Sequence, residues 1–293
     1  MRKKFERQLI TLEDGLQVNY YLAGEQIGKP LILLHGGGTD HALLSWRETI
    51  PVLANAGYRV YAPDYPGYGE SPPGNKPATI KNLIGYLDSF IEYLELDQVT
   101  LIGLSMGGAI ALGYAINKPS KVSSLVLIGS YGIQDKAPYH FYSYLYLKIP
   151  GLNNALWSMI RNSRWVAKTS IKSIIRNPRS RTESLVDEVL EAMKNGSSHK
   201  AFNEMQQDEI LCKKIKTNFT NRLPELQMPV LIIHGTHDIG VPVKYARRAA
   251  SLIRNSRLEV IENAGHWIQR DYPEIVNKII LDFVCQGGGS PDT

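Results

Sequence analysis

The chain predicts a doubly wound α/β fold, in which helices cover both faces of a mostly parallel sheet. Two observations carry this prediction: short apolar runs without alternation recur along the chain, and segments with helical spacing lie between them. The apolar runs cover residues 31–34, 59–62, 99–102, 125–128, 230–234 and 258–261. At 293 residues and 43% hydrophobic content, the chain is large enough to bury a substantial core.

The remaining elements of this core follow from local pattern. Residues 5–12 and 16–23 flank Asp14-Gly15, a dipeptide that favours the tight turn of a β-hairpin. Apolar residues within 80–94 recur on one helical face, and a last helix is predicted behind Pro273, because proline is favoured in the first turn of a helix. In such a sheet, ligands are expected at the carboxyl ends of the strands.

The alternation of strands and helices stops for about a hundred residues after the sixth strand. Residues 131–222 contain amphipathic helical patterns without strands, and we expect them to form an inserted helical lid, called the lid segment below. Residues 1–130 and 223–286 then form the core, and 287–293 a flexible tail. An aromatic stripe at 139–147 fits either a substrate pocket or the underside of a helix packed on the core.

The charge of the chain is uneven. The net charge is +5, and residues 131–229 hold 15 Lys and Arg against 9 Asp and Glu. These charges are spread at helical intervals, as on a solvated surface, so we expect neither a nucleic-acid nor a membrane partner. No apolar run resembles a signal peptide or a membrane span, which predicts a cytoplasmic protein. The pattern does not address oligomeric state.

The segment Gly103-Leu104-Ser105-Met106-Gly107 joins an apolar strand to a helix of small residues. A serine at such a corner adopts a strained backbone conformation with its side chain clear of the sheet, and the positions that flank it, here Gly103 and Gly107, must be nearly free of side chains. The N-terminal end of the following helix would face the serine oxygen. We therefore expect Ser105 to be a nucleophile.

A serine nucleophile needs a base and an acid that orients the base. Among the seven histidines, His266 follows the last predicted strand, where a loop would hold it over the carboxyl edge of the sheet. Asp238 follows the preceding strand, which gives the chain order Ser105, Asp238, His266 expected of this arrangement. Asp135 and Asp271 remain alternatives for the acid.

The oxyanion that develops during acyl transfer needs backbone N–H donors. His35-Gly36-Gly37-Gly38 follows the first core strand and offers unobstructed N–H groups. We expect Gly37 and Met106 to donate, with Gly38 as a possible substitute. No metal or cofactor is expected, because the two cysteines lack metal-ligand spacing and no phosphate-binding pattern ends the glycine run.

In this order, and over about residues 5–285, these motifs resemble the α/β-hydrolase superfamily. Within the superfamily, the chain resembles small single-domain bacterial carboxylesterases with a helical cap. That resemblance implies a serine carboxylesterase that hydrolyses small to medium esters through an acyl-enzyme.

Two alternatives stay open. His266-Trp267 and the triple glycine also resemble hydrolases that cleave carbon–carbon bonds of dienone ring-fission products, although those enzymes usually carry Asn where this chain has Leu104. Trp267 and Leu104 are then possible oxyanion or substrate contacts. Some proteins of this fold are instead slow-turnover ligand receptors.

Overall fold

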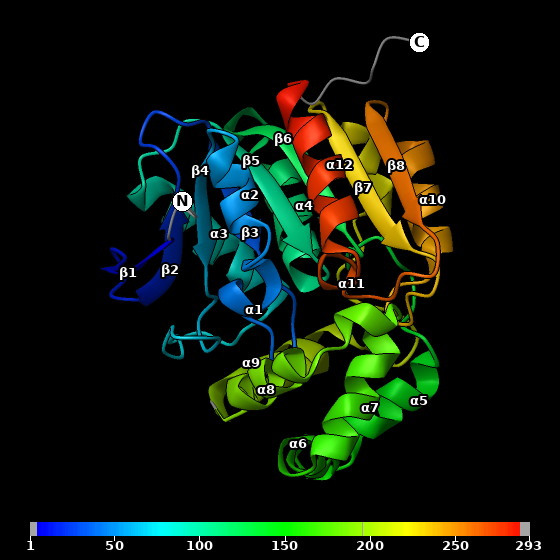
Figure 1. Cartoon of the computed structure of the whole chain (residues 1–293). Helices are drawn as coiled ribbons and strands as arrows, with labels where there is room; N and C mark the ends of the chain where they lie inside the picture. Colours follow the sequence, from blue (N-terminus) through cyan, green and yellow to red (C-terminus); the bar gives the residue numbers. More distant parts are fainter. Residues whose placement is uncertain (1–4, 195, 288–293) are drawn as a thin grey trace.

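The computed structural model describes residues 5–194 and 196–287. Within these residues, eight strands form one sheet in the order β1-β2-β4-β3-β5-β6-β7-β8 (Figure 1). The strands are β1 (Glu6–Thr11), β2 (Gln17–Ala23), β3 (Pro30–Leu34), β4 (Arg59–Pro63), β5 (Val99–Leu104), β6 (Val122–Ile128), β7 (Val230–Gly235) and β8 (Ser256–Ile261). The predicted tail beyond Gly287 lies outside the described residues.

The sheet is mostly parallel, as predicted. β1 pairs with β2 and β2 with β4 in antiparallel fashion, whereas all pairs from β4 to β8 are parallel. Every residue of β5 and of β7 is buried, which explains why these strands read as continuous apolar runs.

Helices cover both faces of the sheet. One face packs against α3 (Ile80–Tyr93), α4 (Met106–Asn117) and α10 (Val243–Leu252). The other packs against α1 (Ala42–Trp46), α2 (Ile50–Asn55), α11 (Ile268–Asp271) and α12 (Pro273–Cys285). No helix among the described residues is both long and apolar enough to cross a bilayer.

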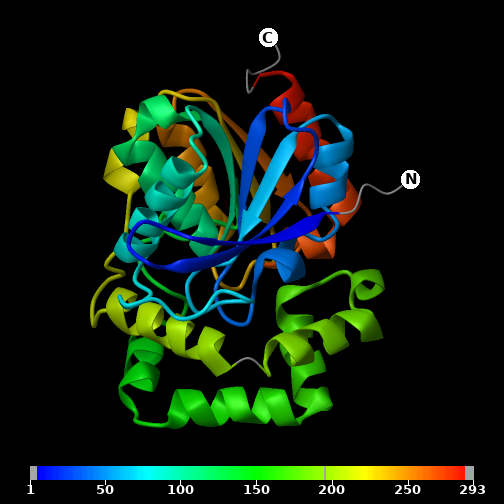
Figure 2. The same cartoon turned by 90° about the vertical axis from the view of Figure 1, so that its left-hand side faces the viewer.

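The lid segment contains the helices that lie between β6 and β7. They are α5 (His140–Lys148), α6 (Leu152–Asn162), α7 (Arg164–Ile174), α8 (Glu183–Ala192) and α9 (Gly196–Glu209). Figures 1 and 2 show them as a separate layer beyond the carboxyl ends of the parallel strands. The layer faces the edge of the sheet where ligands are expected, and its role as a lid stays a prediction.

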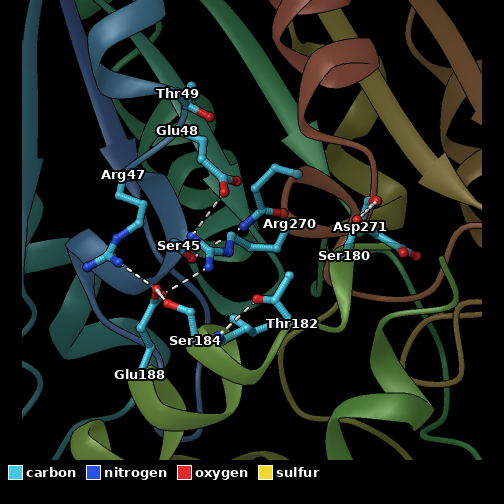
Figure 3. A network of polar contacts seen from close by, with 12 residues as sticks. Ser45, Arg47, Glu48, Thr49, Ser180, Thr182, Ser184, Glu188, Arg270 and Asp271 are labelled. Atoms are coloured by element: carbon cyan, nitrogen blue, oxygen red, sulfur yellow. Dashed lines mark hydrogen bonds and ion pairs between the residues drawn. The ribbon is translucent and has the colours of Figure 1, made fainter. Parts of the chain in front are cut away.

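Two adjacent residues of α11 join this layer to the core (Figure 3). The side chain of Arg270 lies 3.0 Å from Glu188 of α8, which also pairs with Arg47 at 2.5 Å. The fully buried Asp271 accepts hydrogen bonds from the backbone N–H groups of Arg176 and Asn177, at 3.0 and 2.7 Å. The connection between α7 and α8 is thus fixed to the loop that follows β8.

Candidate active site

Ser105 occupies the corner between β5 and α4 with φ 49° and ψ −113°, a conformation that residues with side chains rarely adopt. A Cβ atom on Gly103 would lie 2.4 Å from the carbonyl oxygen of Gly107. One on Gly107 would lie 2.3 Å from the carbonyl oxygen of Leu34. The two glycines are therefore required by close backbone packing between strand and helix.

Three side chains from separate loops meet at this corner. His266 Nε2 lies 2.9 Å from Ser105 Oγ, and His266 Nδ1 lies 2.8 Å from both carboxylate oxygens of Asp238. Asp238 Oδ1 also accepts the N–H groups of Gly240 and Val241, each at 2.8 Å, which fixes the carboxylate. In this arrangement Nδ1–H donates to Asp238, and Nε2 accepts the serine hydroxyl proton.

The electrostatics of the pair favour a charged carboxylate next to a basic imidazole. Burial raises the pKa of Asp238, but the charge and hydrogen bond of His266, with His234 and the Val241 N–H, together outweigh it, so the pKa falls below its ordinary value. Burial opposes protonation of His266, but the Asp238 carboxylate outweighs that effect and raises the pKa of His266. Asp238 thus stabilises the imidazolium that forms when His266 accepts a proton.

The alternative acids predicted from the sequence have other partners. The side chain of Asp135 is half exposed to solvent and pairs with Arg248 at 2.7 Å. Asp271 accepts the N–H of Gly265 at 2.7 Å in addition to its bonds to the lid segment. Asp271 therefore contacts the backbone next to His266 rather than the imidazole.

The glycine run after β3 lies beside Ser105. The N–H of Gly36 is engaged, because it donates to Asp40 Oδ2 at 2.7 Å. Met106 is the first residue of α4, so its N–H has no acceptor within its own helix. Gly38 has φ +81°, and a Cβ atom there would lie 3.6 Å from Trp157 of α6.

The ring of Phe202 from α9 lies directly over Gly37. A Cβ atom on Gly37 would be 2.4 Å from this ring, so the lid segment covers the glycine run closely. Glycine at position 37 therefore serves the packing of the lid segment as well as the exposure of a backbone N–H.

Leu104 and Trp267 are placed differently from Ser105. Both are buried, and neither lines the cavity that contains Ser105 and His266. The side chain of Leu104 packs behind Gly36, 3.3 Å from where a Cβ atom would lie. Trp267 belongs to the core on the α1 and α12 face, and its backbone N–H donates to the carbonyl of Ile174 at 3.1 Å.

The cavity beside Ser105 has a volume of about 200 Å³. Its wall is mainly apolar and comes from the segment after β6, from α9 and from the loop after Asp238. The lining side chains include Met106, Tyr131, Gln134, Ala137, Phe202, Met205, Gln206, Glu209, Ile210 and Val241. Among these described lining residues there is no Lys or Arg.

Glu209 is the charged side chain of this wall. Its carboxylate accepts hydrogen bonds from Tyr131 Oη at 3.0 Å and from Thr217 Oγ1 at 2.6 Å. Burial raises the pKa of Glu209, although these hydrogen bonds act in the opposite direction. The polar end of the cavity is thus an acceptor of hydrogen bonds.

Sequence reasoning missed Asp40, Phe202 and Glu209. Asp40 is buried and also accepts from Ser45 Oγ at 2.5 Å, and its burial raises its pKa to about 7. An acidic residue two positions after a glycine run was the available signal for Asp40. Phe202 and Glu209 had no comparable signal, because the orientation of α9 depends on how the lid segment packs.

Comparison with known proteins places the chain in a family. Residues 29–273 match the family model described as the alpha/beta hydrolase fold. The chain belongs to the α/β-hydrolase family. With Ser105, His266 and Asp238 in hydrogen-bond contact, it is a serine hydrolase of this fold.

Dienoate hydrolases and esterases are among the proteins that the chain resembles. A 2-hydroxy-6-oxononadienedioate/2-hydroxy-6-oxononatrienedioate hydrolase of Pseudomonas putida is 31% identical over 93% of both chains. A meta-cleavage product hydrolase from Pseudomonas fluorescens is 26% identical to this chain. Its structure superposes with a TM-score of 0.79, covering 95% of this chain and 97% of the Pseudomonas fluorescens chain. An esterase from Exiguobacterium antarcticum is 25% identical, with a TM-score of 0.76 over 96% and 100% of the two chains.

These similarities correct the prediction of a serine carboxylesterase with an ester substrate, which is wrong. The curated relatives are named as hydrolases of 2-hydroxy-6-oxo dienoates, and further relatives of 26% to 28% identity carry names of the same type. The alternative, a hydrolase of dienone ring-fission products, is the better supported one. The error came from giving Leu104 too much weight, since its side chain lies outside the catalytic cavity.

Proposed function

We propose that this hydrolase cleaves the carbon–carbon bond beside a ketone in a 2-hydroxy-6-oxo dienoate or a close analogue. The observation that carries the proposal is the full-length similarity to a hydrolase named for such compounds. A 2-hydroxy-6-oxo dienoate contains no ester or amide bond. Its hydrolysis must therefore break a carbon–carbon bond next to the 6-oxo group.

The proposed reaction begins with ketonisation of the substrate, which moves the proton of the 2-hydroxyl to C5. Ser105 Oγ then adds to the C6 carbonyl carbon while His266 Nε2 takes the serine proton. The carbonyl oxygen becomes an oxyanion, which the N–H groups of Gly37 and Met106 would stabilise.

Collapse of this intermediate breaks the C5–C6 bond. The electron pair delocalises through the C3–C4 double bond onto the 2-oxo oxygen, and the proton held by His266 completes the 2-hydroxy diene product. Water, activated by His266, then hydrolyses the acyl group from Ser105 as a carboxylic acid. One water is consumed for each substrate cleaved.

The cavity favours one orientation of the substrate. The cavity, with a volume of about 200 Å³ and a mainly apolar wall, suits an uncharged substituent at C6. A carboxylate there would face the Glu209 carboxylate. A second hollow of about 260 Å³, which reaches Thr39 next to the glycine run, is lined by Arg161 and His199. We propose that the substrate carboxylate is directed toward Arg161.

The test compares a 2-hydroxy-6-oxo-hexa-2,4-dienoate carrying methyl or phenyl at C6 with p-nitrophenyl butyrate. We expect kcat/KM for the dienoate to exceed that for the ester by about tenfold or more. Arg161→Gln should raise KM for the dienoate without raising it for the uncharged ester. A dienoate left intact by an enzyme that turns over the ester would contradict the proposal.

A further inference from the structure

The outward face of α5 is apolar and exposed. Tyr139, Phe141, Tyr142, Leu145 and Ile149 are all exposed, with Tyr139 at 84% and Tyr142 at 72%. From Phe141 onward their spacing places them on one side of the helix, and the opposite side carries the buried Leu147. The aromatic stripe seen in the sequence is therefore mainly on the outside, neither in a pocket nor under a helix.

The exposed apolar residues continue onto the next two helices. Leu156 and Met159 of α6 are exposed, and Trp165 at the start of α7 is 75% exposed. Of the 14 exposed large hydrophobic side chains among the described residues, eight lie within residues 139–165. These eight are called the outer lid face below. Exposed apolar side chains gathered on three consecutive helices favour an interaction surface over singly scattered exposed residues.

The charge of this region has one sign. Residues 136–172 contain six Lys and Arg and no Asp or Glu. Arg164 and Lys168 pair with Glu183 of α8, whereas Lys136, Lys148 and Lys172 have no ion pair within residues 5–194 and 196–287. Exposed aromatic and aliphatic side chains among unpaired lysines are typical of helices that lie in the interface of a membrane.

The position of these helices permits such contact. Figures 1 and 2 show α6 at the end of the molecule farthest from the sheet, with α5 and α7 extending from it toward the core. A flat surface could approach them without meeting the core. The cavity beside Ser105 lies under the same lid segment, since Ala137 and α9 contribute to its wall.

We propose that the outer lid face docks the protein on anionic lipid bilayers as a peripheral membrane surface. The inference is independent of the proposed reaction. A second copy of this chain is a poorer occupant, because a symmetric contact would place a surface with basic residues and no acidic ones against its own copy. The sequence analysis expected no membrane partner, because the sequence displays the charges but not the exposure of the aromatic residues beside them.

The test is sedimentation with vesicles of equal parts phosphatidylcholine and phosphatidylglycerol, compared with phosphatidylcholine alone. We expect the full-length protein to sediment with the anionic vesicles and to be released by salt. Phe141→Ser with Trp165→Ser should lower the bound fraction by about fivefold or more. Lys148→Gln and Lys172→Gln should each weaken binding by about fivefold, the effect of about 1 kcal/mol per cation.

The matched control is Leu9→Ser with Ile27→Ser, which removes two exposed apolar side chains outside the outer lid face. This control should bind like the unmodified protein, and all variants should retain hydrolysis of a water-soluble substrate. No sedimentation with anionic vesicles, or equal loss in the control, overturns the proposal. A concentration-dependent dimer that the Phe141 and Trp165 changes convert to monomer would also overturn it, in favour of a second copy.

Discussion

Removal of the hydroxyl oxygen of Ser105 should abolish turnover while leaving substrate binding intact. Ser105→Ala should lower kcat by about 10⁴-fold or more, because the imidazole then has no nucleophile to activate. The measurement is turnover of the best dienoate substrate, with binding followed by substrate absorbance. Stoichiometric labelling of another serine by an organophosphate would show that the nucleophile lies elsewhere.

Asp238 has a different contribution, since it contacts the base His266 and not the nucleophile. Asp238→Asn should lower kcat by about 10⁴-fold, because an amide favours the wrong imidazole tautomer and removes the counter-charge. Asp135→Asn, which alters an exposed pair with Arg248, is the matched control and should leave kcat near normal. The opposite result in folded variants would move the acid to Asp135.

The raised pKa of His266 predicts how kcat/KM depends on pH. Only neutral His266 can accept the serine proton, so kcat/KM should fall on the acid side as the imidazole becomes protonated. Because Asp238 raises the pKa of His266, this fall should begin above the ordinary histidine value of about 6.5. A pH–rate profile that is flat down to pH 5, well below that value, would argue against histidine as the base.

Gly37 offers a test of how the lid segment covers the site. Gly37→Ala keeps the N–H donor but puts a methyl group against the Phe202 ring. We expect a loss of activity that the double variant Gly37→Ala with Phe202→Ala partly reverses, since the added methyl then has room. Phe202→Ala alone is the control, and strictly additive losses would show that the two positions do not contact each other.

At the scale of secondary-structure elements, α11 connects the catalytic loop to the lid segment through Asp271. This carboxylate accepts N–H groups from Gly265, Arg176 and Asn177. Asp271→Asn replaces one acceptor by a donor that faces these N–H groups. We expect a loss of about 2–3 kcal/mol in unfolding free energy.

The same substitution should lower kcat more than it raises KM, because it displaces the backbone next to His266 rather than a substrate contact. Asp282→Asn, an exposed change on α12, is the matched control. Denaturant unfolding and steady-state kinetics measure the two effects. An unchanged kcat in a destabilised Asp271→Asn would restrict its role to stability.

At the scale of the whole molecule, stability in acid depends on buried histidines. His35 is fully buried, with Nδ1 donating to the Gly36 carbonyl and Nε2 accepting the Tyr65 N–H, and burial lowers its pKa to about 3. Because the folded-state pKa lies below the unfolded one, this contribution is lost as the pH falls from about 6.5 toward 3. At pH 4.5 the cost is about 2.7 kcal/mol, two units at 1.36 each.

His35→Phe should therefore reduce, by about this amount, the difference in unfolding free energy between pH 7 and pH 4.5. Contributions from other groups are common to both proteins and cancel. Urea unfolding at the two pH values measures the difference, and exposed His237→Gln is the control. An unaltered pH dependence in His35→Phe would mean that folding does not lower the pKa of His35.

The sequence was sufficient for the sheet, the order of its strands along the chain and the meeting of Ser105 with Asp238 and His266. Those features depend on local signals: buried apolar runs, glycines where backbones approach closely, and polar residues at strand ends. The wall of the cavity could not be predicted, because Phe202 and Glu209 come from a helix whose orientation is decided by tertiary packing. For the same reason, the sequence did not reveal which side of α5 faces solvent.

The order of elements has a consequence for synthesis on the ribosome. Strands β1 to β6 emerge before the lid segment, whereas β7 and β8, with the loops that carry Asp238 and His266, emerge last. Until then Ser105 has neither base nor acid, so a nascent or truncated chain is chemically inert. The same interval leaves the edge of β6 unpaired, since its neighbour β7 begins about a hundred residues later. Slow translation of the lid segment would therefore prolong exposure of an apolar strand edge, the kind of surface on which chains aggregate and chaperones act.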